Sequence, residues 1–329
     1  MMGFARKHWF LLLILAGTLL VLLCPDWLGW TVWLNPSLFG AAAVFLSAWT
    51  METRSLGNAV VRPLPALWAM VISYGLLPGL ALLTGGLLPE PPDFRIGLLL
   101  IASVPCTLAS AMIWTRLADG DEATALLVTF LTNCTSWLIT TAWLTLGTGD
   151  ANLRVDAAPM MGKLLLVLVA PVALGQLLRG VGSMGRAATA HKATLGVIAR
   201  LMIVAIMLKA GVEVRGRVAS EGTTTGPVAL VAVAGLCLAL HLTALYCGLW
   251  SSKALGFARP SQIAVAIGGS QKTLPIALVL FDAYFQKFPL AVVPMVFYHF
   301  GQLIVDTIIA HRLADRRLPE PEAPEEEIV

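Results

Sequence analysis

Charged residues are scarce in this sequence: Asp, Glu, Lys and Arg make up 12% of its 329 residues, whereas a soluble domain carries about 25%. Hydrophobic residues make up 58%, and the mean hydropathy is +0.82. This composition excludes a disordered chain, a collagen-like fibre, a nucleic-acid-binding protein and a soluble cytosolic enzyme. The sequence therefore predicts a polytopic membrane protein surrounded by the lipid bilayer.

Cysteine is also scarce, and the five cysteines form no CxxC pair. Neither a disulfide framework nor a zinc site is predicted. The 22 Lys and Arg residues are scattered between apolar runs, so no nucleic-acid partner is predicted. The sequence also predicts no cofactor and no catalytic residue.

Long apolar runs are what the sequence does contain. A bilayer core needs about 20 apolar residues per helix. Ten runs of this kind lie near residues 8–24, 37–51, 64–85, 95–117, 122–147, 160–182, 194–212, 226–250, 260–283 and 288–310. The predicted fold class is therefore an all-α integral membrane protein with ten transmembrane helices. Residues 311–329, rich in Pro and Glu, are predicted to form a disordered tail.

The positive charges predict the orientation in the membrane. Arg6 and Lys7 precede the first run, Arg179 lies at the end of the sixth, and Arg312 follows the tenth. These residues are all on one side of the membrane if every run spans it. Because Lys and Arg accumulate on the cytoplasmic side, both termini are predicted to be cytoplasmic. The membrane is predicted to be a cell or inner membrane.

The fourth and ninth runs are interrupted near their middles. The fourth contains Ser103–Ser110 (SVPCTLAS) and the ninth contains Gly268–Pro275 (GGSQKTLP). Each is the fourth helix of a block of five, and the blocks cover 8–147 and 160–310. Since five spans turn the second block over in the membrane, the sequence predicts an inverted repeat.

Proline removes a backbone donor and glycine permits unwinding, so both interrupted helices are predicted to break. Broken backbone in a membrane must face protein or a watery cavity. Matching breaks in two halves are typical of the binding site of a secondary transporter. The alternative interpretation is a simple proline kink in each helix.

The helices after the breaks carry polar faces at helical spacing. These residues are Thr129, Thr132, Asn133, Ser136 and Thr140 in the fifth run and His299, Gln302 and Asp306 in the tenth. They are predicted to line the breaks, and helix-to-helix hydrogen bonding is the alternative.

Lys272 lies between Gln271 and Thr273 at the second break. Inserting a charged residue at the centre of a membrane helix costs about 2.5–3.5 kcal/mol, so Lys272 needs a partner or a watery cavity. Snorkelling of the side chain to the membrane surface is the alternative. His241 is interpreted as a structural histidine, and Arg200 is expected near an end of the seventh helix.

The residues predicted to bind substrate or ion lie at the two breaks and on the two polar faces. They are Thr107, Ser110, Thr129, Thr132, Asn133, Ser136, Ser270, Gln271, Lys272, Thr273, His299 and Asp306. Positive half-helix ends and Lys272 favour a small organic anion as the substrate.

Four segments together resemble the bile acid:sodium symporter superfamily, and within it the SBF-like branch of the human solute carrier 10 family member 7 type. These segments are Pro105–Leu117, Gly120–Ala123, Ser270–Pro275 and Pro294–Gln302. The resemblance implies a panel domain and a core domain in which the two broken helices cross, with transport by alternating access.

In sodium-coupled members, the resemblance implies cation ligands that match Ser110, Thr132 and Gln271 here. This sequence departs from the family at Ala111, Ile267 and Lys272, where such members have Asn, Glu and Asn. Our hypothesis is that the Lys272 ammonium occupies the space of a coupling cation, so that transport is independent of sodium and is proton-coupled or an exchange. Sodium and proton are the two candidates for the coupling ion.

The sequence thus predicts a secondary transporter of a small organic anion, with no prediction of the oligomeric state. A regulatory or ion-handling membrane protein without a transport cycle is one alternative. An intramembrane enzyme is another, for which His299 and Asp306 are the nearest acid–base pair, two helical turns apart.

Overall fold

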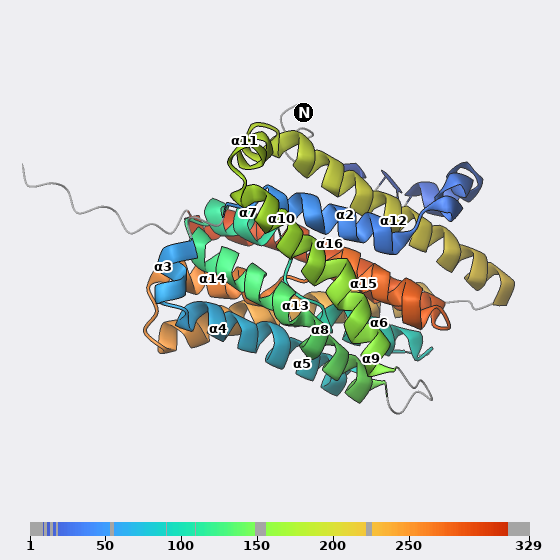
Figure 1. Ribbon diagram of the computed structural model, residues 1–329. Helices are drawn as coiled ribbons and strands as arrows, with labels where there is room; N and C mark the ends of the chain where they lie inside the picture. Colours follow the sequence, from blue (N-terminus) through green and yellow to red (C-terminus); the bar gives the residue numbers. More distant parts are fainter. Residues whose placement is uncertain are drawn as a thin grey trace, which may run out of the picture.

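The computed structural model describes residues 9, 12–13, 16–17, 19–52, 56–89, 91–108, 110–148, 156–221 and 226–314. Within these residues the chain is helical and contains no strand. The long helices run alongside one another (Figure 1). The prediction of an all-α fold is confirmed.

Among the described residues, seven helical stretches are long and apolar enough to cross a membrane. Two of them are single helices, α8 (Glu122–Gly147) and α13 (Pro227–Ala254), and a third is the Lys192–Glu213 part of α12 (Lys192–Glu221). The other four join consecutive elements: α4 (Leu64–Val71), η3 (Ile72–Leu76) and α5 (Leu77–Gly85); α9 (Ala157–Leu164), η5 (Leu165–Val169) and α10 (Ala170–Gly180); α14 (Arg259–Ser270), α15 (Leu274–Leu280) and η6 (Phe281–Phe285); and η7 (Pro289–Ala291) and α16 (Val292–Ala314). An eighth candidate is η1 (Pro25–Trp33) with α2 (Pro36–Trp49), which bend by 81°.

These stretches match seven of the ten predicted runs. The fourth predicted run forms two helices that are each too short to span, α6 (Asp93–Ser103) and α7 (Ser110–Leu117). The run 8–24 is described only in part, because 8, 10–11, 14–15 and 18 lie outside the described residues, so ten spans remain a prediction. Of the predicted tail, residues 311–314 continue α16 and the rest lies outside the described residues. Two short helices, α3 (Leu56–Val61) and α11 (Gly182–Ala190), complete the described chain.

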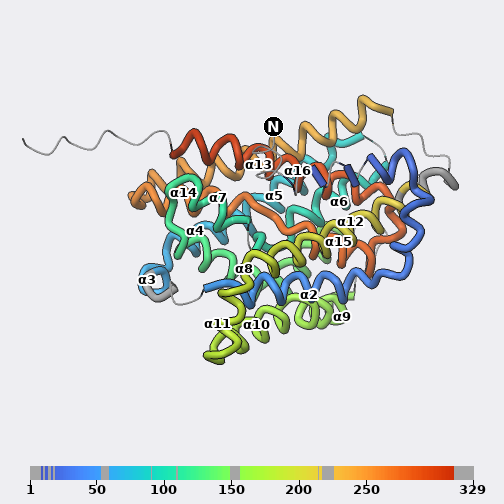
Figure 2. Tube along the Cα trace, turned by 90° about the horizontal axis from the view of Figure 1, so that it is seen from above, coloured from blue at the N-terminus to red at the C-terminus, as the bar shows by residue number. Residues whose placement is uncertain are grey.

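The helices pack in two groups. α2 packs against α10 and α12, whereas α14 packs against α13, α4 and α8, and α16 packs against α13 and α6. Seen from above, α2 and α10 lie at one side of the molecule and α13 and α16 at the other (Figure 2). The broken stretch Arg259–Phe285 is buried throughout its apolar part, as unwound backbone in a membrane requires.

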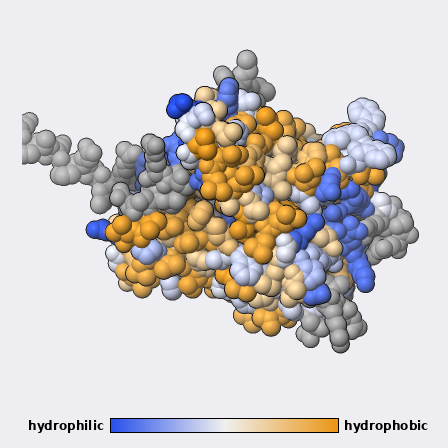
Figure 3. All heavy atoms as spheres, in the orientation of Figure 1, coloured by the Kyte–Doolittle hydropathy of each residue, from blue (hydrophilic) through white to orange (hydrophobic). Residues whose placement is uncertain are grey.

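Exposed apolar side chains cover the outside. Leu83, Leu166, Leu177 and Val228 are among the large hydrophobic residues that the fold leaves exposed. Hydrophobic atoms cover most of the face shown in Figure 3, and hydrophilic residues gather toward its ends. A soluble protein does not expose so much apolar surface, so this outside fits contact with lipid.

Gly97 marks the closest approach between α6 and the start of the last span. A β-carbon at this position would lie 2.0 Å from the Ala291 carbonyl oxygen and 2.6 Å from Pro294 Cγ. We expect Gly97→Ala to destabilise the fold by about 1–3 kcal/mol through overpacking, measured as a lower Tm of the purified protein. Gly79→Ala on α5 is the control, because nothing lies within 4 Å of its β-carbon position. Equal Tm values for the two variants would contradict this packing.

Candidate functional site

Two breaks in the helices meet inside the molecule. The first break lies between α6 and α7 (residues 104–109), and the second lies between α14 and α15 (residues 271–273). Val104 leaves the helical conformation with ψ 160°, as expected for a residue before proline, and Gln271 does so with ψ 141°. The Thr273 amide donates a hydrogen bond of 3.0 Å to the Pro105 carbonyl, so the breaks touch directly.

The polar face of α8 satisfies the backbone of the first break. Thr132 Oγ1 accepts from the Cys106 amide at 3.3 Å, and Asn133 Nδ2 donates to the Cys106 carbonyl at 3.0 Å. Thr129 Oγ1 donates to the Thr107 carbonyl at 3.4 Å. Ser136 donates only to the Asn133 carbonyl of its own helix and does not reach a break. These side chains replace hydrogen bonds that the unwound backbone has lost.

The polar face of α16 does the same for the second break. Gln302 Oε1 accepts from the Lys272 amide and its Nε2 donates to the Lys272 carbonyl, both at 2.9 Å. The Tyr298 hydroxyl donates to the Ser270 carbonyl at 2.8 Å. His299 Nδ1 lies 3.0 Å from Gln302 Nε2. Each break is therefore held by the next long helix of the chain, α8 for the first break and α16 for the second.

Gln271 connects the two breaks through its side chain. Its Oε1 accepts from Thr107 Oγ1 at 2.7 Å and from Ser110 Oγ at 3.1 Å, and its Nε2 donates to Asp306 Oδ2 at 2.6 Å. Asp306 Oδ1 in turn lies 2.9 Å from His241 Nε2. The carboxylate therefore pairs with His241 and not with His299, the partner considered for an enzyme.

Lys272 is fully buried, so the snorkelling alternative is wrong. Its ammonium donates to the Ser73 carbonyl at 2.7 Å, to Ser73 Oγ at 2.9 Å and to the Val104 carbonyl at 2.9 Å. It also lies 5.1 Å from the centre of the Tyr74 ring. All three ammonium donors thus have protein partners, and Lys272 is not among the residues that line the cavity described below.

The three residues that matched sodium ligands in the family do not suit a sodium ion here. The Gln271 oxygen already accepts two hydrogen bonds, and the Thr132 hydroxyl accepts from Cys106 and donates to the Val128 carbonyl. A hard cation needs free oxygen ligands, carboxylates above all. The Asp306 carboxylate is engaged by Gln271 and His241, and the buried Lys272 ammonium lies beside Gln271 in the chain.

A cavity of about 500 Å³ lies between the touching breaks and the helices α2 and α12. Thr107, Ser110, Thr273 and His299 line it on the side of the breaks, and apolar residues such as Leu108, Trp114 and Leu303 line much of the rest. These four residues are the predicted site residues that reach the cavity. Seven others lie in the hydrogen-bonded network behind it: Thr129, Thr132, Asn133, Ser270, Gln271, Lys272 and Asp306.

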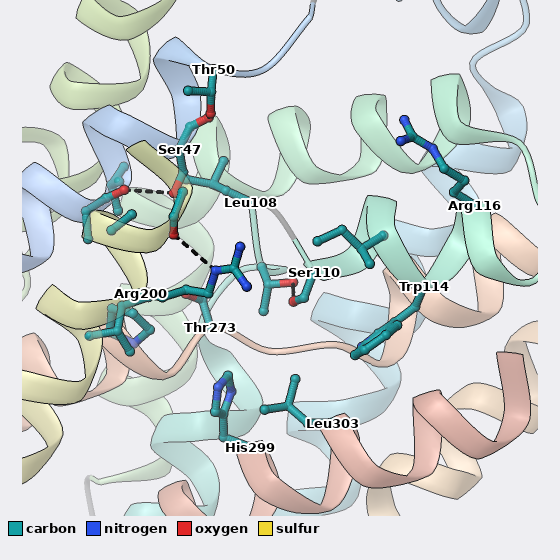
Figure 4. Close-up of a pocket in the computed structure, with 18 of the residues that line it drawn as sticks. Ser47, Thr50, Leu108, Ser110, Trp114, Arg116, Arg200, Thr273, His299 and Leu303 are labelled. Carbon is teal, nitrogen blue, oxygen red and sulfur yellow. Dashed lines mark hydrogen bonds between the residues drawn. The ribbon is translucent and has the colours of Figure 1, made fainter. Parts of the chain in front are cut away.

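Arg200 enters the cavity from α12 (Figure 4). Its Nε donates to the Gly196 carbonyl at 3.0 Å, and its guanidinium carbon lies 5.1 Å from the centre of the Trp9 ring. Its terminal nitrogens have no hydrogen-bond partner among the described residues. Arg116 also lines the cavity, but its guanidinium is engaged in a bidentate ion pair with Glu122. No Asp or Glu lines the described cavity, so Arg200 gives it a positive charge.

Sequence reasoning assigned no functional role to Arg200, His241 or Ser73. Arg200 had a usable signal, since an arginine inside an apolar span is costly and points to a functional site. His241 had the same signal as an ionisable residue within α13. Ser73 had none, because its role depends on how the α4–η3–α5 stretch packs against the second break.

Comparison with known proteins identifies the family of this chain. The model of the SBF-like CPA transporter family matches residues 8–315. A probable sodium/metabolite cotransporter BASS4, chloroplastic, of Arabidopsis thaliana is 24% identical over 277 residues, which cover 81% of this chain and 63% of the relative. The protein of the same name from Oryza sativa subsp. japonica is 26% identical over 94% of this chain and 76% of the relative.

An uncharacterised protein of Pseudomonas aeruginosa is 27% identical over 69% of this chain and 67% of the relative. The match of the family model extends over nearly the whole chain, and the apolar spans agree with it. The chain therefore belongs to the SBF-like CPA transporter family and is a multi-pass membrane transporter.

Proposed function

We propose that the protein is a secondary transporter that moves a small organic anion across the membrane by alternating access. The observation that carries this proposal is the contact between the two breaks beside the cavity, from the Thr273 amide to the Pro105 carbonyl. Touching unwound segments at a cavity are the usual architecture of a transporter binding site. Arg200 supports an anionic substrate because its terminal nitrogens face the cavity without a hydrogen-bond partner among the described residues.

The proposed architecture is ten helices in two inverted repeats, 8–147 and 160–310. The order of elements supports it, since α6–break–α7 followed by α8 corresponds to α14–break–α15 followed by α16. We assign α2, α10 and α12 to the panel and the helices of the breaks to the core. Movement of one group against the other would open the cavity to each side in turn, with both termini in the cytoplasm.

Transport is proposed to be independent of sodium. The Lys272 ammonium forms three hydrogen bonds at the crossing and would fill the place of a coupling cation there. The plant relatives carry the words sodium/metabolite cotransporter in their names, so this chain would differ from them in its coupling.

Flux measurements on purified protein in proteoliposomes test this function. Labelled carboxylates, sulfonates and phosphate esters that fit a cavity of about 500 Å³ would be offered with and without sodium, with protein-free liposomes as the control. We expect uptake of at least one anion at equal rates with sodium and with choline. No uptake of any anion would contradict transport, whereas uptake only in sodium would contradict the fixed-cation role of Lys272.

A further inference from the structure

Asp306 and His241 form a buried acid–base pair behind the second break. Their exposed fractions are 1% and 0%, and Asp306 Oδ1 lies 2.9 Å from His241 Nε2. The other imidazole nitrogen, Nδ1, lies 3.3 Å from the Ser270 carbonyl oxygen. The other carboxyl oxygen, Oδ2, accepts from Gln271 Nε2. Neither residue of the pair lines the cavity.

The hydrogen-bond partners determine how many protons the pair holds. A carbonyl oxygen can only accept, so His241 Nδ1 must carry a proton to bond with Ser270. Nε2 faces a carboxyl oxygen, and a second proton must lie between these two atoms if they are to attract each other at 2.9 Å. The pair therefore holds two protons in this conformation, either as imidazolium and carboxylate or as neutral imidazole and carboxylic acid. Both forms have no net charge.

Loss of one proton would disrupt the pair. Two lone pairs would then face each other, either across the 2.9 Å between Nε2 and Oδ1 or, in the other tautomer, across the 3.3 Å between Nδ1 and the Ser270 carbonyl oxygen. In both cases a net negative charge would remain in a buried position, where it costs several kcal/mol, and it would favour movement of Asp306 toward other donors. Gln271 would move with it, because its amide is held between Asp306 and the hydroxyls of Thr107 and Ser110. Those hydroxyls line the cavity, so a change in the protonation of the pair would move groups that face the substrate.

The neighbouring titratable groups described here do not donate a proton to Asp306 in place of His241. On α16, the Tyr298 ring meets His241 edge-on at 5.7 Å and its hydroxyl is bound to Ser270. His299 is turned toward Gln302, and Cys106 of the first break lies near enough to interact with Asp306 electrostatically. Lys272 directs its ammonium to Ser73 and Val104, and Tyr74 of η3 donates to the Thr132 carbonyl. None of these groups donates to Asp306.

We propose that the His241–Asp306 pair binds the proton to which anion transport is coupled, loaded in this conformation and released to water when the crossing rearranges. This proposal rests on the transport function proposed above and deepens it by naming the coupling site. Gln271 is the positioning residue that links the pair to the cavity. Its amide oxygen is occupied by two hydroxyl donors, so it acts here as a hydrogen-bond link and not as a cation ligand.

The first test is the Tm of the full-length protein between pH 5 and 9. The unfolded chain loses its imidazole proton near a pH of about 6.5. The proposal requires that the two hydrogen bonds of His241 hold the second proton of the folded pair at a pH where the unfolded chain has already lost it. The folded state therefore loses stability as the pH rises, and a Tm decrease of about 5 °C from pH 6.5 to 8.5 is expected from one extra bound proton. The Tm readout does not depend on knowing the substrate.

The test variant is Asp306→Asn. The new amide can donate to His241 Nε2 and accept from Gln271 without a titratable proton, so the variant is expected to fold and to lose this part of the pH dependence. His241→Gln is the second variant and has the same expected loss. His191→Gln, which removes an exposed imidazole at the end of α11, is the control and should keep the wild-type slope. The proposal is overturned if Asp306→Asn or His241→Gln keeps that slope too.

The second test uses the wild-type protein alone. Proteoliposomes that take up an anion without sodium would be given an imposed pH gradient, and uptake is expected to rise or fall with the direction of that gradient. An uptake rate that does not depend on the pH gradient would overturn the proton coupling and leave the transport function intact. A protein that transports no anion but shows the Tm difference would instead refute the transport function and leave the proton site standing.

Discussion

Replacing Lys272 with methionine is expected to abolish anion uptake. Methionine fills nearly the same volume but has no donor, so the Ser73 and Val104 carbonyls would lose their partner in a fully buried position. Each unsatisfied buried group costs about 1–3 kcal/mol. The variant would also remove the positive charge that holds the first break against the second. Uptake in proteoliposomes and Tm would be measured on the same preparation.

Ser73→Ala is the matched control for this variant. It removes only the hydroxyl that accepts from Lys272 at 2.9 Å. The Ser73 carbonyl, which accepts at the shorter distance of 2.7 Å, stays in place. We expect it to retain most of the uptake. Wild-type uptake by Lys272→Met would show that the ammonium is dispensable and would contradict its role as a fixed cation.

Replacing Arg200 with glutamine is expected to raise the KM for the transported anion by about 10- to 100-fold. A hydrogen bond to a charged partner contributes about 1.5–3 kcal/mol, and each 1.4 kcal/mol changes affinity about tenfold. Arg200→Lys keeps the charge but loses the planar fork, so an intermediate KM is expected. The measurement is the concentration dependence of uptake, with Tm as the check on folding.

Arg186→Gln serves as the control for Arg200, because Arg186 is exposed on α11 and does not line the cavity. It should leave the KM at the wild-type value. A KM that is unchanged in Arg200→Gln would mean that the anion is recognised elsewhere, and the assignment of Arg200 would then be wrong.

The broken helices could be predicted from the sequence because their cause is local. Pro105 and Pro275 act on the backbone at their own positions, and the polar residues of α8 and α16 recur at helical spacing beside them. Both features are determined within a single helix, so the sequence of that helix is enough to predict them. The same reasoning placed Thr107, Ser110, Thr273 and His299 at a common site, and these four residues line the cavity.

The partners of the buried charges could not be predicted in this way. Asp306 binds His241 because α13 packs against α16 with one particular rotation, which the sequence of either helix alone does not determine. Lys272 points to Ser73 for the same kind of reason, so its predicted contact with the substrate was replaced by a contact with the protein. Arg200 was expected near the end of its helix, but the packing of α12 on α2 directs its side chain into the cavity.

Accessibility of one cysteine from both sides of the membrane tests the proposed transport cycle most directly. Leu303 lines the cavity and is 8% exposed, and Leu303→Cys would be made in a protein whose partly exposed Cys24, Cys134 and Cys247 are replaced by serine. A membrane-impermeant thiol reagent should modify Cys at this position when it is applied from either side, and a transported anion should slow both reactions. Modification from one side only, whatever anion is present, would contradict a cavity that opens alternately to the two sides.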